Sequence, residues 1–196
     1  MIYLPEVTVI CNTWMKYEET VRAINFTLTQ ITPREVVFVS PNLTIDGCRN
    51  VYAPKMTPEE HSKWCIKEYH TLFNTTHALN IHHDGYVLNG NCWQDEWLNL
   101  DMIGAKWLYT DGMNVGNTGF CLRSKKLWET IANADFITKF HPEDEVIGRD
   151  YRPILEKQYG IKYATEEQAD MFSFEQVAPK QKTFGFHNYL HKPFEN

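Results

Sequence analysis

Residues 78–89, with the sequence ALNIHHDGYVLN, decide how the rest of this chain is interpreted. The first four residues predict a short buried strand, which runs directly into three polar side chains, His82, His83 and Asp84. Open α/β folds bind their ligands at the carboxyl ends of their strands. Two imidazoles and a carboxylate at such a strand end could hold Mn²⁺, Mg²⁺ or Zn²⁺.

The same stretch also has a simpler interpretation as a turn. Asp84 and Gly85 are adjacent, and both residue types favour turns for backbone reasons alone. Taken alone, the stretch favours the turn. The choice between a turn and a ligand site therefore depends on motifs elsewhere in the chain.

The composition indicates one globular domain that spans residues 1–196 and has enough chain to bury a core. Apolar residues make up 43% of the chain, and the aromatic content of 14% is more typical of core filling than of sugar or base platforms. The net charge of −6 argues against strong non-specific binding of nucleic acid, which needs a basic footprint.

The cysteines and the N-terminal sequence favour a cytoplasmic location. The five cysteines form no Cys-x-x-Cys pair, which disfavours a structural zinc site and suits a reducing compartment. The first residues lack the basic and apolar regions of a signal peptide, and no apolar run is long enough to span a membrane. No obligate protein partner is evident.

The spacing of apolar residues predicts alternating strands and helices. The opening strand, helix and strand imply parallel pairing with a right-handed crossover. The expected elements are a strand at 7–11, a helix at 17–30 ended by Pro33, strands at 36–39 and around 50–53, a helix with a capping box from Thr57 to about Phe73, the strand at 78–81, a helical or irregular segment at 93–101, a strand at 120–122, a helix at 125–133 capped by Ser124, a helix from Pro142 to Gly160 interrupted near Pro153, and a strand at 161–164.

Two further motifs carry candidate functional residues. In residues 115–123, VGNTGFCLR, two glycines allow the backbone to approach an oxygen-rich ligand, although a plain turn before a strand explains them equally well. In residues 141–145, HPEDE, the carboxylates complement a helix dipole, or one of them points into a cleft as a general base.

In this order, the motifs resemble those of the GT-A-fold glycosyltransferases, and most of all a group of small, poorly characterised bacterial and viral members. The resemblance covers residues 78–188, and the matching residues are Asp84, 103–107 (IGAKW), 115–123 (VGNTGFCLR), 142–144 (PED), 169–175 (ADMFSFE) and 184–187 (FGFH). It implies a Rossmann-like α/β fold whose mixed, mainly parallel sheet is flanked by helices.

The resemblance also implies a metal site. In GT-A enzymes an Asp-x-Asp motif holds a divalent cation that bridges the donor diphosphate. This chain has His82-His83-Asp84 at that position, so only the last aspartate is kept, and His82 either replaces the first one or contacts the nucleotide. The implied ligands of Mn²⁺ or Mg²⁺ are Asp84, His187 and His82.

The remaining roles implied by the resemblance concern the substrates. Asp144 would be the catalytic base of an inverting enzyme. The expected nucleotide contacts are Asn12, Thr13, His83, Asp84 and Gly85, and the residues expected near the donor sugar and the acceptor are Gly116, Asn117, Thr118, Gly119, Phe120 and Glu143.

The leading hypothesis is a metal-dependent glycosyltransferase that moves a hexosyl or pentosyl group from a nucleotide sugar, such as a UDP-sugar, to a hydroxyl of a glycan or another acceptor. One alternative acceptor is a hydroxymethylated base of phage-type DNA, although the net charge counts against it. Arg123, Lys125 and Lys126 beside Trp128 could form a basic patch for it, but a solvated helix face explains them equally well.

Two alternatives involve no glycosyl transfer. One is a catalytically degenerate module that only binds nucleotide or sugar, and the other is a zinc hydrolase. The hydrolase lacks the helical His-x-x-x-His spacing. The other histidines are expected to be surface or packing residues: His61, His70, His77, His141 and His191.

Overall fold

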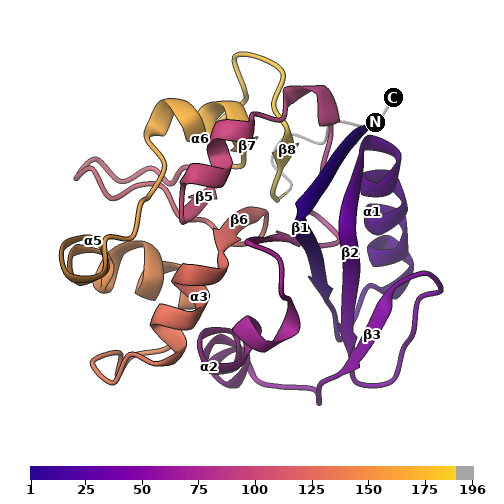
Figure 1. Cartoon of the computed structure of the whole chain (residues 1–196), viewed down its shortest axis with the longest axis horizontal. Helices are drawn as coiled ribbons and strands as arrows, with labels where there is room; N and C mark the ends of the chain where they lie inside the picture. The colour runs from indigo at the N-terminus through magenta and orange to yellow at the C-terminus, as the bar shows by residue number, and fades with distance from the viewer. Residues whose placement is uncertain (189–196) are drawn as a thin grey trace.

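The computed structural model describes residues 1–188, and its centre is a six-stranded sheet with the strand order β3-β2-β1-β4-β6-β5 (Figure 1). Only β6 runs antiparallel to its neighbours. The predicted mixed, mainly parallel sheet is therefore confirmed. The strands are β1 (Ile2–Asn12), β2 (Ile31–Ser40), β3 (Arg49–Tyr52), β4 (His77–Ile81), β5 (Met102–Gly104) and β6 (Cys121–Ser124).

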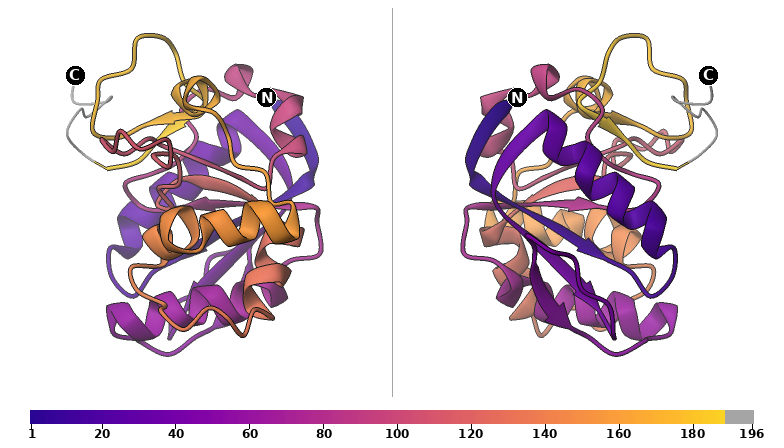
Figure 2. Two further views of the ribbon diagram at one scale, coloured as in Figure 1. Left: turned by 90° about the vertical axis from the view of Figure 1, so that its left-hand side faces the viewer. Right: turned by 90° about the vertical axis from the view of Figure 1, so that its right-hand side faces the viewer.

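Helices cover both faces of the sheet, because alternate residues of the central strands point into two separate apolar clusters. Val9 of β1 packs on the side of α1 (Tyr17–Gln30) and α6 (Glu166–Phe172), whereas Ile10 packs on the side of α2 (Pro58–Glu68), α3 (Lys125–Ala132) and α5 (Arg152–Tyr159). Figure 2 shows the sheet between these helices from two sides.

Short elements complete the described chain. The 3₁₀ turns are η1 (Tyr69–Leu72), η2 (Gly90–Cys92) and η3 (Asp95–Asn99), the single turn α4 (Glu143–Glu145) continues into the π-helical η4 (Val146–Asp150), and a small sheet pairs β7 (Ser173–Phe174) with β8 (Gly185–Phe186). None of the helices between residues 1 and 188 is long and apolar enough to cross a membrane.

The helix starts follow local side-chain chemistry, as the sequence predicts. The Thr57 side chain accepts the Glu60 N–H and the Glu60 side chain accepts the Thr57 N–H, so the capping box at the start of α2 is confirmed. Ser124 caps α3 by accepting the Leu127 N–H at 3.0 Å.

The helix predicted at 17–30 is confirmed as α1, but Pro33 is not what ends it. Pro33 lies inside β2, because β2 begins at Ile31 and pairs with an N-terminal extension of β1. The interruption predicted near Pro153 falls at Tyr151, and Pro153 itself belongs to the first turn of α5, where a missing N–H does no harm. The strand predicted at 161–164 is wrong. Residues 161–164 form no strand but a single bridge between Met102 and Tyr163.

Two features of the fold bring distant residues to one edge of the sheet. Parallel pairing aligns Cys11 of β1 with Ile81 of β4, so Asn12 and His82 leave neighbouring strands side by side. Near the C-terminus, the Asn188 N–H donates to the Asp84 carbonyl at 2.9 Å, which holds His187 beside the turn that follows β4.

Candidate functional site

His82, Asp84 and His187 form a cluster at the carboxyl end of β4. Their potential ligand atoms all lie within 4.8 Å of one another. A tight turn after β4 positions the first two residues, because the His82 N–H donates to the Gly85 carbonyl at 2.7 Å and the Gly85 N–H returns a bond to His82 at 3.2 Å. The turn and the ligand cluster therefore coexist in the same residues.

The cluster has the donors that a divalent cation needs. Asp84 Oδ1 is buried and accepts no hydrogen bond from any residue between 1 and 188, and His83 Nδ1 lies 3.5 Å from it. An unpaired buried carboxylate oxygen is unfavourable, and a cation would satisfy it. Two imidazole nitrogens and a carboxylate suit Mn²⁺ or Zn²⁺ better than Mg²⁺, which prefers oxygen ligands.

Burial keeps His82 in the neutral form that can coordinate a cation. Burial, reinforced by the neighbouring His187, lowers the pKa of His82 to about 4. Its Nε2 lies 3.3 Å from Nδ2 of Asn80, whose amide also donates to the Thr118 carbonyl at 2.8 Å. A neutral imidazole has one lone pair and one N–H, and because the Asn80 amide nitrogen can only donate, the contact favours the tautomer with the lone pair on Nε2 and the N–H on Nδ1.

His187 is oriented by a buried carboxylate that the sequence analysis assigns no role. The His187 Nδ1 lies 3.1 Å from Oε1 of Glu175, so a neutral ring donates from Nδ1 and leaves the lone pair of Nε2 free. Asn117 Nδ2 donates to the other Glu175 oxygen at 2.9 Å, and Asn117 Oδ1 accepts the Gly119 N–H at 3.0 Å.

The glycines that the sequence analysis places near substrate make room for the His187 ring. A Cβ at Gly119 would lie 1.9 Å from His187 Nε2, and a Cβ at Gly85 would lie 3.0 Å from His187 Cδ2. Gly116 makes room for the Trp107 ring in the same way, because a Cβ at position 116 would lie 2.9 Å from that ring. The Phe120 side chain is fully buried and anchors the loop at 116–120 in the core.

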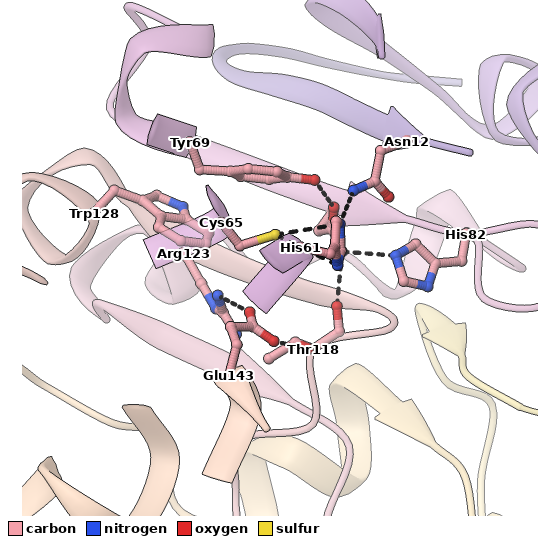
Figure 3. Close-up of a pocket in the computed structure, with 10 residues that line it drawn as sticks. Asn12, His61, Cys65, Tyr69, His82, Thr118, Arg123, Trp128 and Glu143 are labelled. Carbon is pink, nitrogen blue, oxygen red and sulfur yellow. Dashed lines mark hydrogen bonds and ion pairs between the residues drawn. The ribbon is translucent and has the colours of Figure 1, made fainter. Parts of the chain in front are cut away.

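A small polar cavity of about 30 Å³ adjoins His82, with room for about one water molecule. Figure 3 shows Asn12 and His61 on one side of it and Thr118 and Glu143 on the other. Asn12 Nδ2 lies 2.7 Å from His61 Nε2, and burial lowers the pKa of His61. His61, expected to be a surface or packing residue, therefore connects α2 to the site.

A buried ion pair closes the cavity. Arg123 is 1% exposed, its Nη1 donates to Glu143 Oε1 at 2.8 Å, and its guanidinium lies 4.6 Å from the centre of the Trp128 ring. The Thr118 hydroxyl donates to the second Glu143 oxygen at 3.0 Å. Arg123 Nε and Nη2 have no partner within residues 1–188.

The structure does not support a basic patch of Arg123, Lys125 and Lys126 beside Trp128. Arg123 and Trp128 are buried, because β6 extends to Ser124 in the middle of the sheet. Lys125 Nζ donates to the Phe73 carbonyl at 2.7 Å and Lys126 Nζ to the Gly160 carbonyl at 2.6 Å. These residues do not form a joint surface for DNA.

Asp144, Thr13 and His83, which were also predicted to be site residues, are not part of the metal-ligand cluster. Burial, followed by the charge of neighbouring Glu143, raises the pKa of Asp144, whose Oδ1 accepts the Glu145 N–H at 2.9 Å. Within the described chain, no hydrogen bond joins Asp144 to the metal-ligand cluster. The Thr13 hydroxyl donates to the Met15 carbonyl, and the His83 side chain is 38% exposed.

Several contributors were missed, although the sequence holds some signal for them. Asn80 is a polar residue inside a buried strand, and Glu175 ends the motif at 169–175. His70, His77 and His141 lie outside the cluster, as expected, and His191 lies outside the described residues.

Several solved structures with a similar fold are named as glycosyltransferases or as transferases of a particular sugar. A glycosyltransferase involved in the glycosylation of the major capsid of PBCV-1 matches with a TM-score of 0.53 and 14% identity, over 92% of this chain and 91% of that one. The galactosyltransferase LgtC, in complex with donor and acceptor sugar analogs, matches with a TM-score of 0.55 and 10% identity, over 94% and 87%.

The mannosyltransferase PcManGT from Pyrobaculum calidifontis, in complex with GDP-Man and Mn²⁺, matches with a TM-score of 0.53 and 11% identity, over 83% of this chain and 55% of that one. At these identities the similarity shows the fold, which is the GT-A fold. The chain belongs to the family described as "Protein of unknown function (DUF5672)", whose model matches residues 57–187. No curated protein matches the chain.

The buried ion pair gives the first testable prediction. Glu143→Ala leaves the Arg123 charge buried without its partner, which is expected to lower the free energy of unfolding by about 3–5 kcal/mol. Urea denaturation measures this change. Asp150→Ala, which breaks the more exposed pair with Lys139, serves as the control and is expected to change stability by about 1 kcal/mol or less. Equal effects of the two variants would contradict the structural role of Glu143.

Proposed function

We propose that this protein is a metal-dependent glycosyltransferase that moves a hexosyl or pentosyl group from a nucleotide-sugar donor to an acceptor hydroxyl. The observation that carries the proposal is the cluster of His82, Asp84 and His187 at the carboxyl end of β4 in a GT-A sheet. The similar mannosyltransferase with bound GDP-Man and Mn²⁺ supports the combination of nucleotide sugar and cation.

In this proposal Asp84 and His187 hold Mn²⁺ or Mg²⁺, with His82 as a third ligand. The nitrogen donors favour Mn²⁺ of the two. When bound, the cation would stabilise the negative charge that develops on a departing nucleoside diphosphate. Asn12, at the end of β1, and Thr13, His83 and Gly85 are proposed to surround the nucleotide of a UDP-sugar or a related donor.

Asp144 is proposed as the catalytic base of an inverting reaction. The acceptor oxygen would form a bond to the anomeric carbon, while the bond between that carbon and the diphosphate oxygen breaks. The proton of the acceptor hydroxyl would move to the Asp144 carboxylate. The loop from Gly116 to Phe120, with Glu143 behind it, is proposed to lie along the donor sugar and the acceptor.

We propose that residues 1–196 form one glycosyltransferase domain that works in the cytoplasm. The five cysteines are all unpaired in the structure, which suits a reducing compartment.

Thermal-shift measurements with nucleotide diphosphates and nucleotide sugars, each with and without Mn²⁺, test the proposal. A ligand that binds the folded state raises the melting temperature by mass action. We expect a Mn²⁺-dependent rise for one nucleotide class. No shift with any donor, with or without Mn²⁺, would contradict the proposal. Binding of a donor without any transfer or donor hydrolysis would favour the degenerate binding module.

Asp144→Asn tests the base. Turnover is expected to fall by about 10²–10⁴-fold while donor binding is retained, because only the proton acceptor is lost. A base acts in its ionised form, and the pKa of Asp144 is raised above the ordinary aspartate value of 3.8. As the pH is lowered, wild-type activity is therefore expected to be lost at a pH higher than 3.8. Steady-state kinetics across pH measures both effects, with Asp150→Asn as the control. Full activity of Asp144→Asn would contradict this assignment.

The same pKa shift makes a prediction for stability. An acid whose folded-state pKa is raised loses stability as the pH rises from its unfolded value through its folded one. Ionised Asp144 is therefore unfavourable for folding at neutral pH, and Asp144→Asn is expected to be at least as stable as wild type there. A clear loss of stability in urea denaturation at pH 7 would show that the carboxylate has a structural role instead.

Glu175→Gln tests the orientation of His187. Removing the charge of the carboxylate that accepts from Nδ1 is expected to weaken Mn²⁺ binding by about 10–100-fold, as for other residues that position a metal ligand. Electron paramagnetic resonance of free Mn²⁺ measures the affinity. Glu166→Gln, at an exposed position, is the control. Unchanged Mn²⁺ affinity in folded Glu175→Gln would show that this contact does not support a metal ligand.

A further inference from the structure

A groove of about 650 Å³ lies beside the metal-ligand cluster and has no role in the proposal above. One wall comes from residues 106–114, which follow β5, and the other from α6, β7 and the loop at 177–181. A volume of this size falls in the range of sites for small organic ligands, about 300–1,000 Å³. The groove is therefore large enough for a ligand of more than one ring.

Aromatic rings in the groove are held in place by the rest of the structure. The rings of Trp107, Tyr109 and Phe174 line it. Trp107 is fixed against Gly116 and Gly148, at both of which a Cβ would approach its ring to 2.9 Å. The Tyr109 ring lies under the Arg149 guanidinium at 3.5 Å, and its hydroxyl donates to Glu145 at 2.9 Å. Rings fixed in advance lose little entropy when a flat ligand packs on them.

The charged groups of the groove favour a neutral ligand that is rich in hydroxyl groups. Its lining carries four carboxylates against two ammonium groups: Glu166, Glu167, Asp170 and Glu175 against Lys106 and Lys180. Lys106 pairs with both Glu166, at 3.5 Å, and Asp170, at 2.9 Å, so the lining keeps an excess of negative charge. Carboxylates accept hydrogen bonds from hydroxyls but repel phosphates and other anions. A polyanion such as DNA needs the opposite balance.

Two observations indicate a ligand at the inner end of the groove. Ser173 lines it and is 2% exposed, and its hydroxyl has no partner in the described part of the chain, so a hydrogen bond remains to be made there. Glu175 lines the groove and also accepts from His187. The groove therefore ends one side chain away from the metal-ligand cluster.

We propose that this groove binds the acceptor, and that the acceptor is a neutral oligosaccharide. Sugar rings would pack on Tyr109 and Phe174, and their hydroxyls would donate to the groove carboxylates and meet Ser173. This inference rests on the proposed glycosyl transfer and names the acceptor class for it. Of the two acceptors considered above, it favours a neutral glycan over a modified base of DNA.

A binding experiment with defined probes tests the groove. The probes are lactose, cellotriose and maltotriose as neutral sugars, a hyaluronan tetrasaccharide as an acidic one, and duplex DNA that contains 5-hydroxymethylcytosine. Saturation-transfer NMR on the full chain, with Mn²⁺ and a nucleoside diphosphate present, measures binding to each. We expect binding of at least one neutral sugar and none of hyaluronan or DNA.

Matched variants locate the binding. Tyr109→Ala and Phe174→Ala are expected to weaken neutral-sugar binding by at least about 10-fold, the scale of about 1.4 kcal/mol for each aromatic contact. The control is Tyr52→Ala, an exposed tyrosine on β3 at the opposite edge of the sheet, which should bind like wild type. Tyr109 is 40% exposed, so its removal is compatible with folding.

Four outcomes would overturn the inference. Hyaluronan or DNA could bind more strongly than the neutral sugars, the groove variants could bind neutral sugars as well as wild type does, or no neutral sugar could bind. Fourth, Tyr109→Ala could lose nucleotide binding, which would place the donor in the groove.

Thermal shifts with nucleotide sugars distinguish failure of the groove inference from failure of the proposed function. A wild-type protein that binds a donor but no neutral sugar refutes only the groove, whereas one that binds no donor refutes the transferase.

Discussion

The site depends on the contact between the His187 imidazole and the backbone of Gly119. A methyl group at position 119 would overlap His187 Nε2, so the ring fits only because glycine stands there. The Gly119 N–H in turn donates to Asn117, and Asn117 donates to Glu175, which accepts from the same imidazole. The loop before β6 and the C-terminal segment therefore hold each other in position, and with them one side of the metal-ligand cluster.

Burial determines the electrostatic character of this site. Arg123 and Glu143 form an ion pair under it, and Asp84 Oδ1 has no hydrogen-bond partner within residues 1–188. Such an arrangement is unfavourable without compensation, and proteins keep it where a ligand or a reaction uses it. The compensation that we propose for Asp84 is a divalent cation. For Arg123 it is Glu143 together with the Trp128 ring.

Local patterns predict much of the fold and part of the site. The bounds of α1 follow from apolar spacing and the start of α2 from the Thr57 capping box, whereas α2 ends at Glu68, earlier than predicted. His82 and Asp84 follow from a strand that ends in polar residues. The contacts that Glu175 makes with Asn117 and His187 were not predictable, although both Asn117 and Glu175 stand in the motifs, because these contacts join segments far apart in the sequence. Arg123 was misplaced because the strand was expected to end at Leu122, whereas β6 continues to Ser124 with all four residues buried.

The central claim is that His82, Asp84 and His187 form a cation site for a nucleotide sugar. A crystal structure of the full chain with Mn²⁺ and UDP, solved with anomalous data at the manganese edge, tests it most directly. A manganese peak is expected within coordination distance, about 2.0–2.3 Å, of the Asp84 carboxylate and His187 Nε2, with the diphosphate bound next to it. Bound UDP with no manganese at these residues would contradict the claim.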